Sequence, residues 1–76
     1  MNTKPVHVGR SALRLVKLWQ GAHATGQIYQ LTNTSSKTVY LTEQQFLLPN
    51  VLAVGLQQKI IVPAGHTWVY EVVNHG

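Results

Sequence analysis

The chain has 76 residues, which is enough for one domain. The stability of such a domain is marginal, because a domain of roughly 60 residues buries only about 60% of the surface that its unfolded chain exposes. Hydrophobic residues make up 45% of the chain, as in folded domains, whereas charged residues make up 11%, less than half of the roughly 25% typical of soluble domains. Cysteine is absent, which excludes disulfides and thiolate metal sites, and the net charge of +4 reflects the scarcity of acids. This composition suits a domain that works against protein neighbours.

The first ten residues, 1–10, show no sustained hydrophobic period and contain Pro5 and Gly9. We expect them to form a flexible lead-in, with no apolar core of a signal peptide, ahead of a single docking domain over 11–76. No run of about 20 apolar residues is present, so the sequence predicts no membrane-spanning helix.

The segment 11–20 favours a helix. Its apolar residues recur at helical spacing: Ala12, Leu15, Val16 and Trp19. Ser11 is a suitable N-cap, and Gly21 is a suitable stop beyond the last turn. We therefore predict a short N-terminal helix, with a first strand as the competing interpretation, followed by a loop over 21–26.

From residue 26 onward the pattern is that of short strands separated by turns. The predicted strands cover residues 27–33, 37–42, 51–56, 59–63 and 67–73. The first two flank an Asn-Thr-Ser-Ser turn and should pair as an antiparallel hairpin. The last alternates Trp68, Tyr70 and Val72 against a face that carries Val69 and Glu71. Together these elements predict a mainly β fold, a small antiparallel β-sandwich or open barrel with a short N-terminal helix.

Residue types that catalysis requires are scarce. The only carboxylate side chains are Glu43 and Glu71, which we interpret as solvated surface groups and not as a general acid–base pair. No nucleophile elbow surrounds a serine, and the glycines are too scattered for a phosphate-binding loop. The four histidines lie far apart in the sequence: His7, His23, His66 and His75. The sequence therefore predicts a non-enzymatic chain without catalytic residues, metal or cofactor.

The order of turns and apolar positions from residue 33 onward resembles the C-terminal domain of TraK proteins, secretin-like components of the outer-membrane core complex of conjugative type IV secretion systems. The residues that carry the resemblance are Asn33, Thr34, Ser35, Leu41, Glu43, Phe46, Pro49, Val51, Ala53, Val54, Pro63, Gly65 and Tyr70. The segment 15–21 also looks like the helix and glycine that precede this run in the family. The resemblance covers about residues 11–74.

This resemblance implies the C-terminal domain of a longer periplasmic protein, folded as a β-sandwich. It also implies docking to a TraV-type lipoprotein within a ring-shaped multimer that contains a TraB-type channel protein and associates with the outer membrane through these partners. Such a role involves no small-molecule substrate.

Physical reasoning and the resemblance lead to the same expected mechanism. Unpaired edge strands of a small sandwich are templates for strand addition, so we expect an extended partner segment along an edge or across one face. The apolar triplet Phe46-Leu47-Leu48 stands in a connection, where side chains are ordinarily polar, and either covers the end of the sandwich or anchors a partner. Phe46, Leu48 and Trp68 are the predicted partner contacts. The alternative function is a small basic β-module that binds single-stranded nucleic acid through aromatic side chains.

Overall fold

The computed structural model describes residues 6–74, with the backbone alone for residues 6–8. The elements in chain order are β1 (Val6–Val8), β2 (Ser11–Gln20), β3 (Ala24–Asn33), β4 (Val39–Tyr40), the 3₁₀ helix η1 (Glu43–Phe46), β5 (Val51–Leu56), β6 (Ile60–Ile61) and β7 (His66–Asn74). The prediction of a mainly β fold with antiparallel pairing is confirmed. Part of the predicted lead-in 1–10 forms β1, and residues 1–5 lie outside the described residues.

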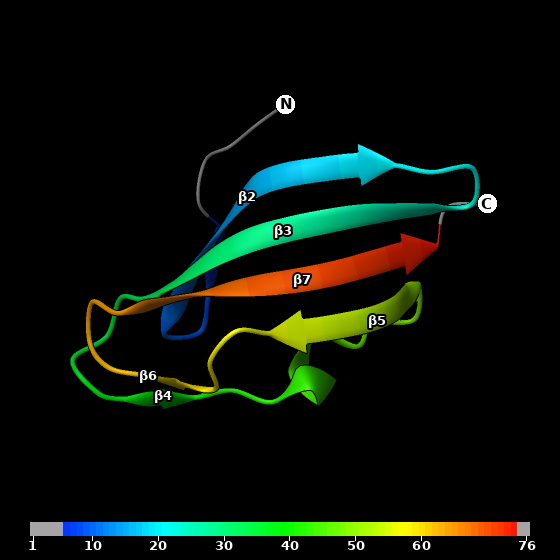
Figure 1. Ribbon diagram of the computed structural model, residues 1–76. Coiled ribbons are helices and arrows are strands. Elements are labelled where there is room, and N and C mark those ends of the chain that lie inside the picture. Colours follow the sequence, from blue (N-terminus) through cyan, green and yellow to red (C-terminus); the bar gives the residue numbers. More distant parts are fainter. Residues whose placement is uncertain (1–5, 75–76) are drawn as a thin grey trace.

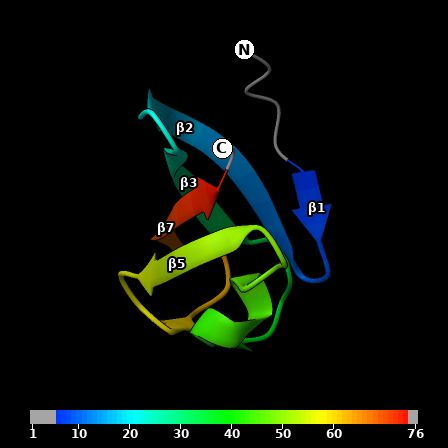
Figure 2. The ribbon, with the colours of Figure 1, turned by 90° about the vertical axis from the view of Figure 1, so that its right-hand side faces the viewer.

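The strands form two layers of unequal size. A five-stranded sheet has the order β1-β2-β3-β7-β5, and β4 pairs with β6 in a separate two-stranded sheet, which we call the ribbon. The ribbon lies on one face of the curved large sheet, which we call the inner face (Figures 1 and 2). Because each ribbon strand has only two residues, the predicted sandwich or open barrel remains a prediction.

Residues 11–20 form strand β2, so the predicted N-terminal helix is wrong and the competing strand interpretation is correct. Leu13 and Leu15 alternate toward the inner face, but a β-bulge between Leu15 and Lys17 inserts Val16 as an extra residue. The extra residue shifts the alternation by one, so β2 has no regular period of two, and the apolar residues at helical spacing belong to both faces: Leu15 lines the inner face and Val16 the outer face.

The predicted hairpin between 27–33 and 37–42 is also wrong. β3 pairs with β2 on one edge and with β7 on the other, and the β3–β7 ladder extends over nine residue pairs. Within 37–42 only Val39–Tyr40 is a strand, and it pairs with β6. β7 has nine residues and alternates regularly, so it forms many more backbone hydrogen bonds with β3 than the two-residue β4 could form. It therefore occupies that edge of β3.

The later strands agree better with the sequence. The predicted strand 51–56 is β5, the run 59–63 contains β6, and 67–73 lies within β7. The predicted alternation of β7 is also found, since Val69 is fully buried on the inner face whereas Tyr70 is 43% exposed on the outer face. The loop between β2 and β3 is limited to 21–23.

The core lies between the inner face and the ribbon. Its buried apolar residues are Leu31, Leu41, Ile61 and Val69, and the partly buried residues packed against them are Leu13, Tyr29, Val39, Phe46 and Leu56. At about 1.5–3 kcal/mol for each fully buried aliphatic side chain, four such residues give a small favourable total against the chain entropy lost on folding.

Asn33 attaches the ribbon to the large sheet. Its side chain is 1% exposed at the end of β3, where Nδ2 donates to the Ile61 carbonyl at 2.9 Å and to the Lys37 carbonyl at 2.7 Å. Its Oδ1 accepts hydrogen bonds from the Ser35 amide at 2.9 Å and the Ser35 hydroxyl at 2.7 Å. One buried amide thus shapes the turn after β3 and holds β6 beneath the sheet.

Candidate functional site: an apolar groove

An open groove of about 960 Å³ runs between the inner face of the sheet and the segment from β4 to η1. Its lining residues are Gly9, Arg10, Ser11, Leu13, Leu15, Tyr29, Leu31, Thr38, Val39, Tyr40, Leu41, Gln45, Phe46, Leu48, Val69 and Glu71. Half of these residues are aliphatic or Phe, so the groove suits an apolar occupant with a few polar contacts.

The groove follows from the unequal length of the two layers. β2 and β3 have ten residues each, whereas the ribbon strands have two, so the ribbon covers only one end of the inner face. Leu13, Leu15 and Tyr29 are consequently only partly buried, although the pleat directs them toward the core side. An incomplete second layer thus leaves apolar sheet surface that a further strand can cover.

Glu71 is the acidic residue of the groove. Its carboxylate is half-buried, and this burial raises its pKa above the usual value. Burial also raises the pKa of Tyr29, with a further contribution from the negative charge of Glu71, and the Tyr29 hydroxyl donates to Gln27 Oε1 at 3.0 Å. Glu71 therefore differs from the solvated surface carboxylate that the sequence predicts.

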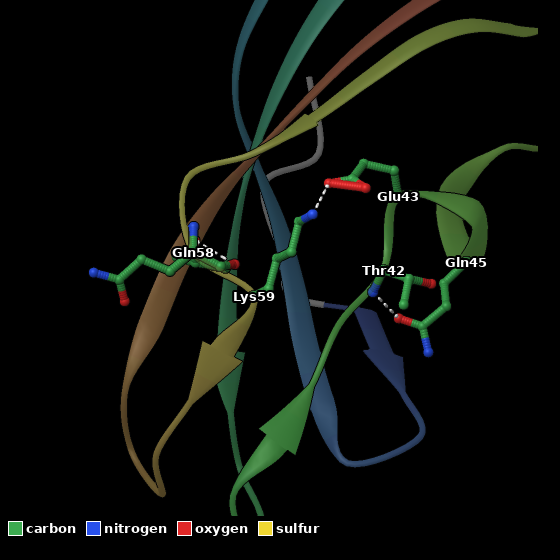
Figure 3. Close-up of polar contacts among 6 residues, drawn as sticks. Thr42, Glu43, Gln45, Gln58 and Lys59 are labelled. Atoms are coloured by element: carbon green, nitrogen blue, oxygen red, sulfur yellow. Dashed lines mark hydrogen bonds and ion pairs between the residues drawn. The ribbon is translucent and has the colours of Figure 1, made fainter.

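A set of polar contacts fixes η1, the wall of the groove that carries Phe46 (Figure 3). Gln45 Oε1 accepts a hydrogen bond from the Thr42 amide at 3.0 Å, which closes the start of η1. Lys59 Nζ, between β5 and β6, lies 2.9 Å from Glu43 Oε1, and this hydrogen bond lowers the pKa of Glu43. Both charged side chains are largely exposed, so the ion pair positions η1 more than it stabilises the fold.

The three predicted partner contacts do not lie together. Phe46 and Leu48 both line the groove: Phe46 is half-buried against the core, and Leu48 is 62% exposed at the rim. Trp68 points to the outer face of the sheet, where its ring makes an edge contact with His66 at 6.3 Å between centroids. Phe46 thus packs on the core and also lines the groove, and its role as a partner contact stays a prediction.

The outer face carries a second, shallower hollow of about 300 Å³ lined by Val16, Lys17, Ile28, Trp68 and Tyr70. Beside it, Lys17 Nζ lies 5.0 Å from the centroid of the Trp19 ring. The Trp19 ring lies so close to Gly26 that a Cβ at this position would be only 2.9 Å from Trp19 Cε3. This face is therefore aromatic and basic, whereas the groove on the inner face is apolar.

Several groove residues were not expected to belong to a binding site. Leu13 and Leu15 are not predicted because the spacing in 11–20 favours a helix. Tyr29 and Glu71 are not predicted because the sequence does not show which face of their strands the short ribbon leaves uncovered. Leu13-Arg14-Leu15 contains the one useful signal, a short alternation of apolar and charged residues.

Two further findings concern residues 6–74. No group of three or more His or Glu side chains among residues 9–74 is arranged to hold a metal ion. No helix there is long and apolar enough to cross a membrane. Of the four histidines considered from the sequence, His75 and the side chain of His7 lie outside the described part of the chain.

Comparison with known protein families matches residues 2–73 to the family described as the TraK C-terminal domain. The match includes β1 and begins before residue 11, where the resemblance seen in the sequence began. No curated protein matches the chain.

Proposed function

Because this chain belongs to the TraK C-terminal domain family, we propose that it is a non-enzymatic docking module of the outer-membrane core complex of a conjugative type IV secretion system. TraK proteins are structural components of type IV secretion in the bacterial envelope and are not an enzyme family. The finer proposal is that the domain works in the periplasm and reaches the outer membrane through its partners.

The observation that carries this proposal is the groove beside an incomplete second layer. β4 pairs with β6 on one edge, and within residues 6–74 no strand pairs with its other edge. An added strand would hydrogen-bond to that edge and place alternate side chains against Leu13, Leu15 and Phe46. The added strand would extend the ribbon and complete a small β-sandwich from two chains.

The proposed occupant is an extended segment of a TraV-type lipoprotein. Backbone hydrogen bonds to β4 supply affinity in strand addition, and side-chain pockets supply specificity. The groove offers such pockets beside Leu48 and Phe46, the two predicted contacts that lie on this face. Contact with a TraB-type channel protein and incorporation into a ring would then use surfaces outside the groove.

Overlapping peptides from the mature cognate TraV-type lipoprotein, titrated into the isotope-labelled chain, test the proposal. We expect amide shifts at β4, η1 and the inner-face residues of β2. The variant Leu48→Asp introduces a charge at the exposed rim and should weaken binding by about tenfold or more, equivalent to about 1.4 kcal/mol. Leu52→Asp is the matched control, because Leu52 is similarly exposed, 59% against 62%, but does not line the groove.

Two results would contradict the docking proposal: no peptide shifts the groove amides at saturating concentration, or Leu48→Asp and Leu52→Asp weaken binding equally. Phe46→Ala is less suitable as the primary variant because Phe46 packs against the core. Trp68→Ala should leave peptide affinity unchanged, since Trp68 lies on the outer face.

The outer face favours a second candidate function, binding of single-stranded nucleic acid. Trp19, Trp68 and Tyr70 offer rings on which bases can stack, and Lys17 adds positive charge. The support is weaker because the cations are dispersed, with Lys59 paired to Glu43 on another surface. Phosphate-driven binding of an oligothymidine should weaken steeply as salt rises, whereas groove binding of an apolar peptide should respond little.

A further inference from the structure

Glu71 occupies a central place in the groove. It is on β7, the strand between β3 and β5, and its register partners are Gln27 and Val54. Along the inner face it follows Val69, which is fully buried in the core. The carboxylate therefore lies where the buried core gives way to open apolar groove, and it is not at a turn or a sheet edge.

No described residue neutralises this carboxylate. Among the side chains of residues 9–74 the ion pair is Lys59 with Glu43, and no hydrogen bond to the Glu71 carboxylate is found among them. Gln27, directly across the ladder, accepts the Tyr29 hydroxyl at Oε1, and no hydrogen bond joins its amide nitrogen to Glu71. The neighbours of Glu71 along and across the ladder are thus uncharged.

Arg10 is the cation that lines the groove, and it stands at the opposite end. It precedes Ser11, which pairs with Asn33 on β3, whereas Glu71 pairs with Gln27. Six residues of strand separate these two positions on β3, or roughly 20 Å at about 3.4 Å per residue. Arg10 is also exposed, so it does not compensate the charge of Glu71.

We propose that Glu71 selects a Lys or Arg side chain in the extended segment that occupies the groove. This inference rests on the proposed docking function and names the chemistry of the partner. A half-buried carboxylate without a cation is unfavourable, and occupation by a purely apolar segment would bury it further. A segment that brings a cation to Glu71 satisfies the charge, whereas a segment without one leaves it desolvated and unpaired.

The partner segment then has a recognisable pattern. Side chains that point to the inner face are apolar where they meet Leu13 and Phe46, and one of them, nearer the Glu71 end, is Lys or Arg. Long basic side chains fit this role, because their methylene stems pack against apolar surface while the charged end reaches the carboxylate. Acidic segments of equal hydrophobicity should be rejected.

Double-mutant cycles on the complex test the pairing. The probe is the lipoprotein peptide that shifts the groove amides, with each of its Lys and Arg residues replaced singly by Met. We expect Glu71→Gln to weaken binding by about tenfold, and one Lys or Arg substitution to weaken it similarly. The two changes together should weaken it no further, whereas Glu43→Gln, the matched control, should be additive with every peptide substitution.

The possible outcomes separate the two proposals. If the peptide binds in the groove but no basic residue couples to Glu71, the cation inference is overturned and the docking function stands. If no lipoprotein peptide binds the groove, both fall. Gln matches Glu in shape, and the amide spectrum of Glu71→Gln without peptide establishes that the variant is folded before any loss of binding is assigned to the missing charge.

Discussion

The substitution Asn33→Ala tests how the ribbon is held on the large sheet. It removes four side-chain hydrogen bonds, of which the bond to the Ile61 carbonyl at 2.9 Å is fully buried. Leaving that carbonyl unsatisfied costs about 1–3 kcal/mol, and the three partly buried bonds, which water can replace, add about 0.5 kcal/mol each. We therefore expect the free energy of unfolding to fall by about 3 kcal/mol.

A loss of this size is large for a domain of this length, whose total stability is about 4–11 kcal/mol. Urea unfolding should reveal it directly, and the thermal midpoint should fall by roughly 12–24 °C. Asn50→Ala is the control, because Asn50 is exposed and its change should stay within about 0.5 kcal/mol. If Asn33→Ala does not fold, Ser35→Ala gives a graded readout of about 1 kcal/mol, since it removes a hydroxyl that bonds to Asn33 Oδ1 and to the backbone of Lys37. A loss below about 1 kcal/mol for Asn33→Ala would mean that apolar contacts alone hold the ribbon.

Three other substitutions have defined expectations. Ala64 has φ of 65°, so Ala64→Gly should relieve strain and raise the free energy of unfolding by about 0.5–1 kcal/mol, measured in urea. Gly26→Ala places a Cβ 2.9 Å from Trp19 Cε3, so the ring should move into solvent and its fluorescence should shift to longer wavelength. Burial raises the pKa of Glu71, so wild-type stability should fall as pH rises from the usual 4.5 toward that raised value, and Glu71→Gln should abolish this fall in urea titrations. The pKa of Glu43 is lowered, and its contribution is lost only as pH falls below 4.5.

The fold was predictable where local chemistry decides it. β5 and β7 are recognisable because their apolar runs are bounded by turn residues. The turn between β6 and β7 is recognisable because proline, whose φ is fixed, stands at its second position as Pro63. Strand pairing was not predictable in the same way. The segment around Val39–Tyr40 is as strand-like as any other, but its partner was decided by competition with β7 for the edge of β3.

The site was predictable in part for a related reason. Phe46 and Leu48 stand out as apolar residues in a connection, which a sequence shows directly, and both line the groove. Glu71 lines the groove because the short ribbon leaves this part of the inner face uncovered. The sequence does not show how far the ribbon reaches, since that depends on how the two sheets pack. Trp68 is an aromatic residue of the kind found in binding sites, but its position in the alternation of β7 places it on the outer face, away from the groove.

The bulge at Val16 interrupts the alternation of β2. With Val16 present, Leu15 pairs with Tyr29 on the inner face and Lys17 begins the outward series that contains Trp19. Deleting Val16 should remove the bulge and leave every later residue of β2 on its present face, because Lys17 then follows Leu15 directly and keeps its pairing with Ile28. Trp19 should stay against Gly26, and the ring-current shift of the Gly26 resonances should persist, as it should in Val16→Ala. Loss of the Gly26 shift in the deletion variant would mean that the register of β2 beyond Leu15 depends on the bulge itself and not on its pairing with β3.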